Sequence, residues 1–311
     1  MVIFELKQPK GMKNILILHN PTAGDAEHSK KHLIALFKGT DMTPKYVSTD
    51  EEGWEKSLEE LPDAIYLAGG DGTVHSVGVE LLKQAKPENR PPIHLLPLGT
   101  ANNIATTLSI NEKDAFKAID PKSSKRKFDC GRQKGIAGDE IFLEGVGMGI
   151  FPELMAKMKE KEEVPGETPE EKLERTLKVL LKTVKKYKAQ TAKIELNGFT
   201  IKGSFLMVEV MNTRYIGPNL QVAPKAAIGD GYLDLVLIPE NKREELEAYV
   251  QTLKEEATAF DLRKLAYTLR VKKVKIKWKG SRVHVDDVLD DEYAGDKIKI
   301  KVLPAALTFL K

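Results

Sequence analysis

The chain has 311 residues, enough for two compact domains, and its 41% of apolar residues can form hydrophobic cores. Lysine and arginine number 49 and aspartate and glutamate 46, so the formal net charge of +3 excludes a polycation that binds nucleic acid through charge alone. The single cysteine, Cys130, excludes an internal disulfide bond and a cysteine-based zinc site, and it suits a reducing compartment.

Short apolar runs alternate with helical patterns over the first ~130 residues, which indicates βαβ units around a parallel sheet. Strands are expected at 14–18, 45–48, 64–68 and 93–97. Helices are expected at 28–37, from 73 to 82, and in a segment that ends at 108. This half of the chain therefore predicts an α/β domain.

The pattern changes after residue 127, where period-two alternation dominates and few helices intervene. Strands are expected at 141–143, 193–196, 204–210, 232–238, 269–278, 282–285 and 297–302. Helices are expected at 169–188 and 242–257, and the charged segment 157–171 is expected to be a loop. The fold class is therefore α/β plus all-β. We predict an α/β domain at 1–128 and an antiparallel β-sandwich domain at 129–311, with the last few residues packing back on the first domain.

Three turns rich in glycine, hydroxyl or amide groups follow strands of the first domain, at 20–24, 69–73 and 99–103. Such turns at the carboxyl edge of a parallel sheet expose backbone N–H groups that favour phosphate oxygens. Asp71 would repel a phosphate unless a cation lies between them, so the turns predict a nucleotide with Mg²⁺ nearby. Ordinary turn chemistry is the alternative at each position. The sequence lacks a Walker-type or Rossmann-type phosphate loop after a strand.

Taken in order, Asn-Pro-Thr-Ala-Gly at 20–24, Gly-Gly-Asp-Gly-Thr at 69–73 and Pro-Leu-Gly-Thr-Ala-Asn at 97–102 resemble the diacylglycerol kinase and sphingosine kinase superfamily. The soluble bacterial lipid kinases are the most similar branch. The resemblance runs from about residue 14 to residue 310, although Gly-Gly-Asp-Gly-Thr alone also occurs in NAD kinases. In the second half it rests on Glu-Gly-Val-Gly-Met-Gly at 144–149, Ala-Pro-Lys-Ala at 223–226 and Gly-Asp-Gly-Tyr-Leu-Asp-Leu at 229–235.

The resemblance implies that the α/β domain binds ATP and that the β-sandwich domain binds the lipid substrate. It also implies a Mg²⁺ ion held by Asp230 and by the backbone carbonyls of Ala227 and Tyr232, which are oxygen ligands of the kind that this cation prefers. The residues implied to bind the nucleotide are Asn20, Pro21, Thr22, Gly24, Thr49, Gly69, Gly70, Asp71, Gly72, Thr73, Thr100 and Asn102.

Two positions depart from the family pattern. Asn103 stands where the family often has an aspartate, and Val288 stands where the family has the glutamate proposed as general base. Valine cannot accept a proton, so we expect an acid of the segment 286–292 to act instead. The catalytic candidates are Asp287 first, then Asp286 and Asp71. Because phosphoryl transfer depends chiefly on positioning and charge neutralisation, losing the base would weaken such a kinase more surely than abolish it.

The leading hypothesis is an ATP-dependent kinase that transfers the γ-phosphate to the hydroxyl group of a diacylglycerol-like lipid, with Mg²⁺ as cofactor. An NAD kinase-like enzyme is one alternative, disfavoured by the segments 223–226 and 229–235. A weakly active or inactive relative that binds lipid or nucleotide is the other, motivated by Asn103 and Val288. The expected partners are ATP, the lipid and a membrane surface, without nucleic acid, and the sequence leaves open whether a homodimer forms.

We expect a cytoplasmic protein that can lie at the inner face of the membrane, because no apolar run approaches the roughly 20 residues of a spanning helix. Residues 1–12 also lack the apolar block of a signal peptide. The helix expected at 169–188 has an apolar stripe flanked by lysines, which favours packing on the sandwich over lying on anionic lipid. Met148, Ile150, Phe151, Met155 and Met158 are likewise expected in a core, with a lipid pocket as the alternative.

Overall fold

The computed structural model describes residues 12–24, 28–161, 164, 166–217, 219–254 and 265–311. The chain divides into two compact units. Unit 1 comprises Met1–Gly99, Ile110–Arg126 and Leu307–Lys311, and unit 2 comprises Thr100–Ser109 and Lys127–Ala306. The third glycine-containing turn is therefore divided, because Gly99 belongs to unit 1 and Thr100 to unit 2.

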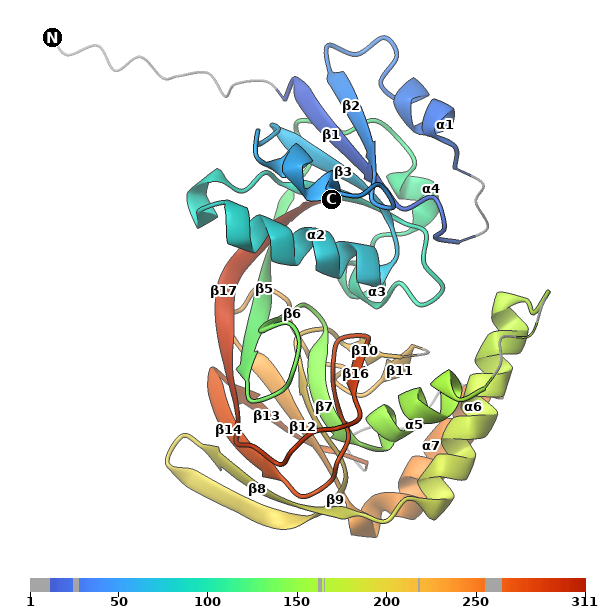
Figure 1. Ribbon diagram of the computed structural model, residues 1–311, viewed down its shortest axis with the longest axis vertical. Coiled ribbons are helices and arrows are strands. Elements are labelled where there is room, and N and C mark those ends of the chain that lie inside the picture. Colours follow the sequence, from blue (N-terminus) through green and yellow to red (C-terminus); the bar gives the residue numbers. More distant parts are fainter. Residues whose placement is uncertain (1–11, 25–27, 162–163, 165, 218, 255–264) are drawn as a thin grey trace, which may run out of the picture. The chain divides into compact units, whose positions relative to one another are not determined.

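Unit 1 contains a parallel sheet in the order β4-β3-β1-β2 (Figure 1). Its strands are β1 (Asn14–His19), β2 (Thr43–Ser48), β3 (Ala64–Gly69) and β4 (Ile93–Pro97). β3 and β4 are buried along their whole length, which explains their unbroken apolar sequences. The end of β17 (Ile298–Leu310) joins this sheet, where Phe309 pairs with Ile93.

The helices of unit 1 follow the expected order with small differences at their ends. α1 (Lys30–Ala35) begins after Ser29, whose side chain caps it, instead of at residue 28. α2 (Asp71–Gln84) begins directly inside the Gly-Gly-Asp-Gly-Thr segment. The short α4 (Glu112–Ala115) and two 3₁₀ turns, Trp54–Leu58 and Pro87–Asn89, complete this unit.

Unit 2 is a curved antiparallel sheet in the order β16-β15-β7-β9-β8-β14-β17, with β12 paired to β9 and to β13. The mixed fold class predicted from the sequence is thereby confirmed. The strands are β5 (Lys125–Lys134), β6 (Ile141–Phe142), β7 (Gly145–Gly149), β8 (Gln190–Leu196), β9 (Phe199–Met211), β12 (Leu233–Pro239), β13 (Tyr267–Val271), β14 (Lys273–Trp278), β15 (Val283–Val285) and β16 (Val288–Asp290). A separate small ribbon contains β10 (Tyr215–Ile216) and β11 (Leu220–Gln221).

The prediction of one strand over 269–278 is wrong, because the chain changes partners at Lys272. β13 pairs with β12, whereas β14 pairs with β8 and β17. The alternation of apolar and charged residues shifts by one position at the break, where Lys272 and Lys273 are consecutive, so the local pattern carries a signal that the prediction missed. The expected strand at 297–302 is also longer, since β17 continues to Leu310.

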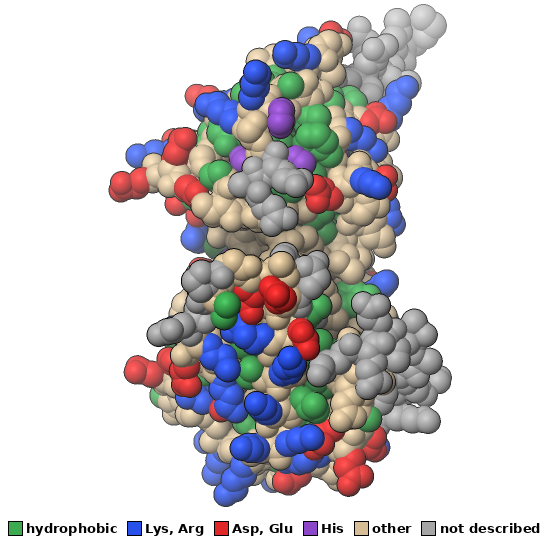
Figure 2. Space-filling model, turned by 90° about the vertical axis from the view of Figure 1, so that its right-hand side faces the viewer, with side chains coloured by type: hydrophobic (Ala, Val, Ile, Leu, Met, Phe, Trp, Pro, Cys, Tyr) green, Lys and Arg blue, Asp and Glu red, His purple; other side chains and the backbone are tan. Residues whose placement is uncertain are grey.

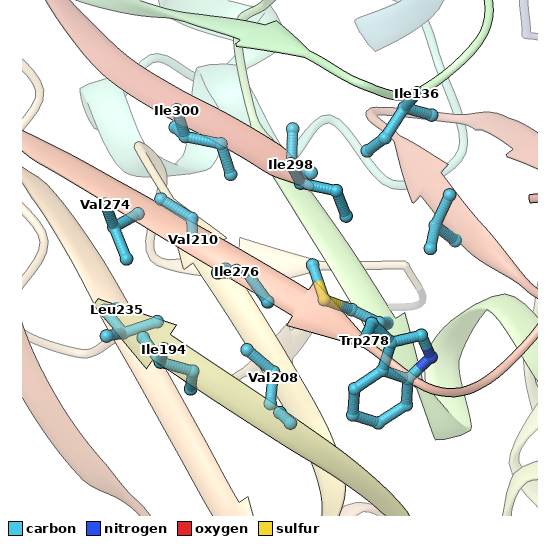
Figure 3. Packing of buried hydrophobic residues seen from close by; sticks show 14 of the residues in the cluster. Ile136, Ile194, Val208, Val210, Leu235, Val274, Ile276, Trp278, Ile298 and Ile300 are labelled. Atoms are coloured by element: carbon cyan, nitrogen blue, oxygen red, sulfur yellow. The ribbon is translucent and has the colours of Figure 1, made fainter. Parts of the chain in front are cut away.

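The inner face of the curved sheet encloses a hydrophobic core, shown in Figure 3. Trp278 of β14 is the largest side chain in this core and is 1% exposed. Isoleucines of β8, β14 and β17 alternate with lysines that point outward, as the burial pattern of β14 demonstrates. Labelled members of the cluster include Ile194, Val208, Val210, Leu235, Val274, Ile276, Ile298 and Ile300.

The outer face near β7, β9 and β12 is covered by helices that pack on one another: α5 (Ile150–Lys159), α6 (Pro169–Lys186) and α7 (Arg243–Lys254) (Figure 1). The sequence did not predict α5, and residues 255–257 of the expected last helix lie outside the described residues. Leu177, Leu180 and Val184 of α6 are buried, which confirms that most of its apolar stripe packs on the unit. None of the helices in the described ranges combines the length and apolarity that a membrane crossing requires.

Candidate functional site

The first two motif turns meet at the carboxyl edge of the sheet in unit 1. The side-chain amide of Asn20 donates a hydrogen bond to Thr73 Oγ1 at 3.3 Å. The Asn20 carbonyl oxygen Oδ1 accepts from the backbone N–H and from the hydroxyl of Thr22, at 3.0 and 2.7 Å. Asn20 thus ties the turn at 20–24 to the start of α2.

Glycines of these turns allow three pieces of backbone to touch. A Cβ atom on Gly24, which has a φ of 67°, would lie 2.5 Å from the carbonyl oxygen of Leu98. One on Gly70 would lie 2.9 Å from the Cα of Gly99, and one on Gly69 would lie 2.6 Å from Thr73 Oγ1. Side chains at these positions would separate the turns, so glycine is required by packing and, at Gly24, also by the left-handed backbone.

The amino end of α2 faces this edge without a side-chain cap. Its N-cap is Gly70, which has no side chain to cap the helix. The first N–H groups of a helix have no intrahelical partner and carry partial positive charge, which favours an anion. Asp71 and Gly72 occupy the first turn of the helix beside them. This end of the helix favours an anion, except where Asp71 opposes it.

Thr49 lies at the neighbouring strand end. Its N–H and its hydroxyl both donate to the backbone oxygen of His19, at 2.8 and 3.3 Å. His19 is buried and contacts the Tyr46 hydroxyl at 2.9 Å, and burial lowers the pKa of this histidine. Thr49 therefore lies beside His19, the last residue of β1 and the residue before Asn20. Its hydroxyl points to the protein backbone.

The third turn leads into α3 (Asn103–Leu108), whose N-cap is Asn102 in a left-handed conformation with a φ of 50°. Asn103 is 3% exposed, and its side-chain amide donates to the backbone oxygen of Gly217 at 3.3 Å. A carboxylate has no hydrogen to donate to that oxygen. The amide at this position, where the family often has aspartate, therefore has a structural explanation in this chain.

An apolar pocket of about 420 Å³ opens in unit 2 between α5, α6 and the β10–β11 ribbon. Its volume lies within the range of small-molecule sites. Among the described residues of its wall, Lys172 alone is charged. The core expected for Phe151, Met155 and Met158 thus has an open side, whereas Met148 and Ile150 are fully buried. The lining residues are Thr100, Ala101, Phe151, Leu154, Met155, Met158, Lys172, Leu173, Thr176, Gly217 and Asn219.

The acidic segment 286–292 begins in the tight loop between β15 and β16. The carboxylate of Asp286 is buried and accepts hydrogen bonds from the backbone N–H groups of Leu143, Glu144 and Gly145, at 2.8, 2.8 and 2.9 Å. These bonds give Asp286 a structural role. Asp287 follows it in the loop and is exposed. The structure thus separates two acids that the sequence could not distinguish.

The loop at 229–232 does not offer Mg²⁺ an open set of oxygens. One oxygen of the Asp230 carboxylate accepts the Tyr232 N–H at 2.9 Å, and the other pairs with the guanidinium of Arg270. The Ala227 carbonyl accepts the N–H of Gly229 at 2.8 Å. Over the described ranges, no three acidic, histidine or cysteine side chains cluster as metal ligands. Because the guanidinium of Arg270 already pairs with Asp230, the oxygen ligands of this loop do not fit Mg²⁺.

Asp129 organises this loop and was missed by sequence reasoning. Its two carboxylate oxygens accept the N–H groups of Gly231 and Ala305, at 2.6 and 2.7 Å. Nearby, burial together with the charge of Asp230 raises the pKa of Asp234 to about 6. Asp129 lies within β5, where nothing in the local sequence distinguishes a loop-binding acid from an exposed one.

Two family models match the sequence. The diacylglycerol kinase catalytic domain matches residues 14–132, and the YegS C-terminal NAD kinase beta sandwich-like domain matches residues 168–311. The first covers the turns that end β1, β3 and β4. The second covers α6 and the strands that follow it.

Curated proteins and solved structures give the same picture. A diacylglycerol kinase of Bacillus subtilis (strain 168) is 29% identical over 244 residues, which cover 73% of this chain and 74% of the relative. A protein named "Probable lipid kinase YegS-like" in Stenotrophomonas maltophilia (strain K279a) is 27% identical, covering 77% of each chain. The crystal structure of a diacylglycerol kinase from Bacillus anthracis str. Sterne superposes with a TM-score of 0.68 at 20% identity, over 97% of this chain and 98% of that chain. A second crystal structure from that organism reaches 0.74, also at 20% identity, over 99% and 98%.

Proposed function

The chain belongs to the bacterial diacylglycerol kinase and YegS-like lipid kinase family, and we propose that it transfers the γ-phosphate of ATP to the hydroxyl group of a diacylglycerol-like lipid. The kinases of this family use ATP. The acceptor distinguishes this activity from that of an NAD kinase. The apolar pocket of unit 2 favours a lipid over NAD as that acceptor.

One observation carries the proposal. Thr100 and Ala101, which belong to a motif of the kinase domain, form part of the wall of the apolar pocket in unit 2. Phe151, Leu154 and Met155 form the apolar part of that wall, which suits an acyl chain, since such surface gains free energy by leaving water. A pocket for a polar acceptor such as NAD would instead need several convergent polar side chains.

ATP is assigned to the carboxyl edge of the sheet in unit 1. The N–H groups at the start of α2 and the glycine-lined turns would hold its phosphates through the backbone, and Asp71 beside them is the acid of that edge. Because Mg²⁺ does not fit the donors around Asp230, no step of the reaction is assigned to a metal at that loop. The proposed nucleotide contacts are Asn20, Pro21, Thr22, Gly24, Thr49, Gly69, Gly70, Asp71, Gly72, Thr73, Thr100 and Asn102.

Asp287 is the proposed general base. It is exposed, whereas the oxygens of Asp286 already accept three backbone hydrogen bonds. Asp287 would take the proton of the lipid hydroxyl as that oxygen attacks the γ-phosphorus, and the bond from the γ-phosphorus to the leaving oxygen of ADP breaks. Val288, 53% exposed at the next position, cannot perform this step.

Contact with an anionic membrane is proposed for the side of unit 2 on which the pocket opens. Leu173 lines the pocket and is 39% exposed, and Val164, in the segment before α6, is 51% exposed. Lysine and arginine side chains gather over this part of unit 2, as Figure 2 shows on the face turned toward the viewer, and the groove between α5 and α6 is lined by several of them. Exposed apolar groups close to lysines favour an interface with anionic headgroups. The lysines that line the groove between the two helices are Lys157, Lys161, Lys178, Lys182 and Lys186.

A phosphate-transfer assay tests the function. The protein, ATP and Mg²⁺ are mixed with micelles that contain diacylglycerol, a sphingoid base or phosphatidylglycerol, and with NAD in a separate arm, and the products are identified by mass. We expect phosphorylated lipid and no phosphorylated NAD. Product from NAD alone, or none in any arm, would contradict the proposal.

A substitution in the wall of the apolar pocket tests whether that pocket binds the lipid. Met155→Glu places a charge on the apolar wall, and we expect the KM for lipid to rise about tenfold or more while the KM for ATP stays unchanged. Phe199→Ser is the matched control, since Phe199 is 72% exposed and lies outside the pocket. Equal effects of the two substitutions would contradict the pocket assignment.

A further inference from the structure

A fully buried acid–imidazole pair lies beneath the loop that carries Asp287. Glu209 of β9 is 0% exposed and His284 of β15 is 1% exposed, and their Oε2 and Nε2 atoms are 3.1 Å apart. Neither side chain belongs to the proposed nucleotide or lipid contacts. A buried carboxylate and imidazole are costly to desolvate, so their presence calls for an explanation.

The two side chains meet above a glycine. Gly147 of β7 pairs with Glu209 on one side and with His284 on the other, so the three residues form one row across the sheet. A Cβ atom on Gly147 would lie 1.7 Å from Glu209 Oε2. The middle glycine of the Glu-Gly-Val-Gly-Met-Gly segment is therefore explained by the room that this pair needs.

The hydrogen bonds of His284 fix where its protons lie. Nδ1 is 2.8 Å from the backbone oxygen of Asp286, and because a carbonyl can only accept, Nδ1 carries a hydrogen. One further proton then lies between Nε2 and Glu209. Burial raises the pKa of Glu209. For His284, burial alone would lower the pKa, but Glu209 and the Asp286 carbonyl outweigh it and raise the pKa.

His284 of this pair contacts the main chain just before Asp287, the proposed base, and it also contacts Phe151 of the pocket wall. Through Nδ1 it holds the main chain of Asp286, whose carboxylate holds the N–H groups of residues 143–145 on the other side. The imidazole also packs in a T-shaped arrangement with the ring of Phe151, with the two centroids 4.9 Å apart, and Phe151 lines the apolar pocket. Asp286 has a φ of 50°, so its backbone is held in a conformation that needs support.

We propose that Glu209 and His284 are a positioning pair, which fixes the Asp286 backbone and so the direction of the Asp287 carboxylate relative to the pocket wall. The inference rests on the proposed function. Neither residue touches substrate, since both are buried. A displacement of about 1 Å at a reacting group can lower the rate about 10²-fold, so loss of the pair should lower kcat.

A double variant separates positioning from packing. His284→Phe alone and Glu209→Leu alone each leave a buried polar partner without its bond, so both should lower the Tm. In Glu209→Leu/His284→Phe neither side chain is left without the other, and the Tm should recover in part, because an apolar pair can pack as well as a buried polar one, whereas the Asp286 carbonyl still lacks the bond from Nδ1. We expect kcat to stay about 10- to 100-fold low in the double variant, with the KM for ATP unchanged. Glu209→Gln, whose amide can donate to Nε2, should keep kcat within about threefold.

Hydrogen exchange gives a readout that does not need kinase activity. The amides of Leu143, Glu144 and Gly145, which bond to Asp286, should exchange about tenfold faster or more in the double variant than in the unaltered protein. His94→Phe is the matched control, because His94 is a buried histidine of unit 1, bonded to the Ala115 carbonyl, and should lower the Tm without moving those amides or kcat.

The outcomes distinguish the two proposals. A double variant with unaltered kcat and unaltered amide exchange overturns the positioning pair. No lipid product from the unaltered protein overturns the proposed function, and the amide exchange still decides on the pair. Should the double variant fail to fold, the ¹⁵N shifts of His284 in the unaltered protein decide, since an Nδ1 without a proton overturns the inference.

Discussion

The candidate site in unit 1 is formed mainly by backbone groups, whereas the one in unit 2 depends on buried acidic side chains. In unit 1, backbone groups form the edge proposed to bind ATP, and glycines at 24, 69 and 70 let three turns touch. In unit 2, buried acids hold loops in place, with Asp286 binding three amides of residues 143–145 and Asp129 binding those of Gly231 and Ala305. A backbone site leaves a run of glycines in the sequence, whereas a site held by buried acids leaves isolated aspartates that resemble surface ones.

The largest expected effect comes from substituting the two adjacent acids, Asp286 and Asp287, separately. Asp287→Ala should lower kcat by about 10²–10⁴-fold with little change in the Tm, because it removes the proposed general base, which is exposed. Asp286→Ala should instead lower the free energy of unfolding by about 3 kcal/mol, since it leaves three buried amides unbonded. Steady-state kinetics and urea unfolding measure the two quantities.

Val288→Glu serves as the companion to that comparison. It returns an acid to the position of the family's base and should raise the low kcat of Asp287→Ala by about tenfold or more. If Asp287→Ala keeps full activity, Asp287 is not the base of this chain.

Glycine substitutions test the backbone site of unit 1. Gly24→Ala should weaken ATP binding by about 10²-fold, because a Cβ at 2.5 Å from the Leu98 oxygen forces two turns apart. Gly39→Ala is the matched control, since Gly39 has a φ of 78° but no atom of the described residues within 4 Å of the added Cβ. It should cost about 1 kcal/mol of stability from its backbone alone and leave ATP binding unchanged. Calorimetric titration with ATP measures both, and equal weakening would contradict the packing argument.

A smaller effect is expected where the chain departs from its family. Asn103→Asp restores the common residue, yet it places a carboxylate against the Gly217 oxygen that the amide now bonds. We expect a loss of about 1–3 kcal/mol in stability and a higher KM for lipid, since Gly217 lines the pocket. Urea unfolding and lipid kinetics measure these effects. Asn219→Asp is the control for the change from amide to carboxylate itself, because Asn219 also lines the pocket. A more stable Asn103→Asp protein would contradict the hydrogen-bond assignment.

The pH dependence of stability should show the smallest effect. Burial raises the pKa of Asp234 to about 6, so the folded state binds a proton more tightly than the unfolded chain does. Asp234 therefore favours folding below pH ~4, and this contribution is lost as the pH rises to about 6. Asp234→Asn should remove this part of the pH dependence in urea unfolding between about pH 4 and 7. An unchanged pH profile would exclude Asp234 as its source.

The sequence predicted most elements of unit 1 and fewer of unit 2. β4 has the predicted bounds, and β1 and β3 extend one residue further, because parallel strands buried on both faces read as short apolar runs between turns. α5 was missed, since its ten residues follow β7 without a turn residue other than Gly149. The break at Lys272 was also missed, although the alternation changes phase there at two consecutive lysines, Lys272 and Lys273.

By itself, the sequence determined the fold class, the family and the order of the turns proposed to bind phosphate, because strand periodicity and glycine-rich turns are local properties of the chain. The tertiary structure alone decided which of two adjacent aspartates is structural, why Asn103 is an amide, and what surrounds Asp230. The first two answers depend on atoms contributed by segments more than a hundred residues away, Gly217 for Asn103 and residues 143–145 for Asp286. A hydrogen bond across that separation leaves no periodic pattern along the chain.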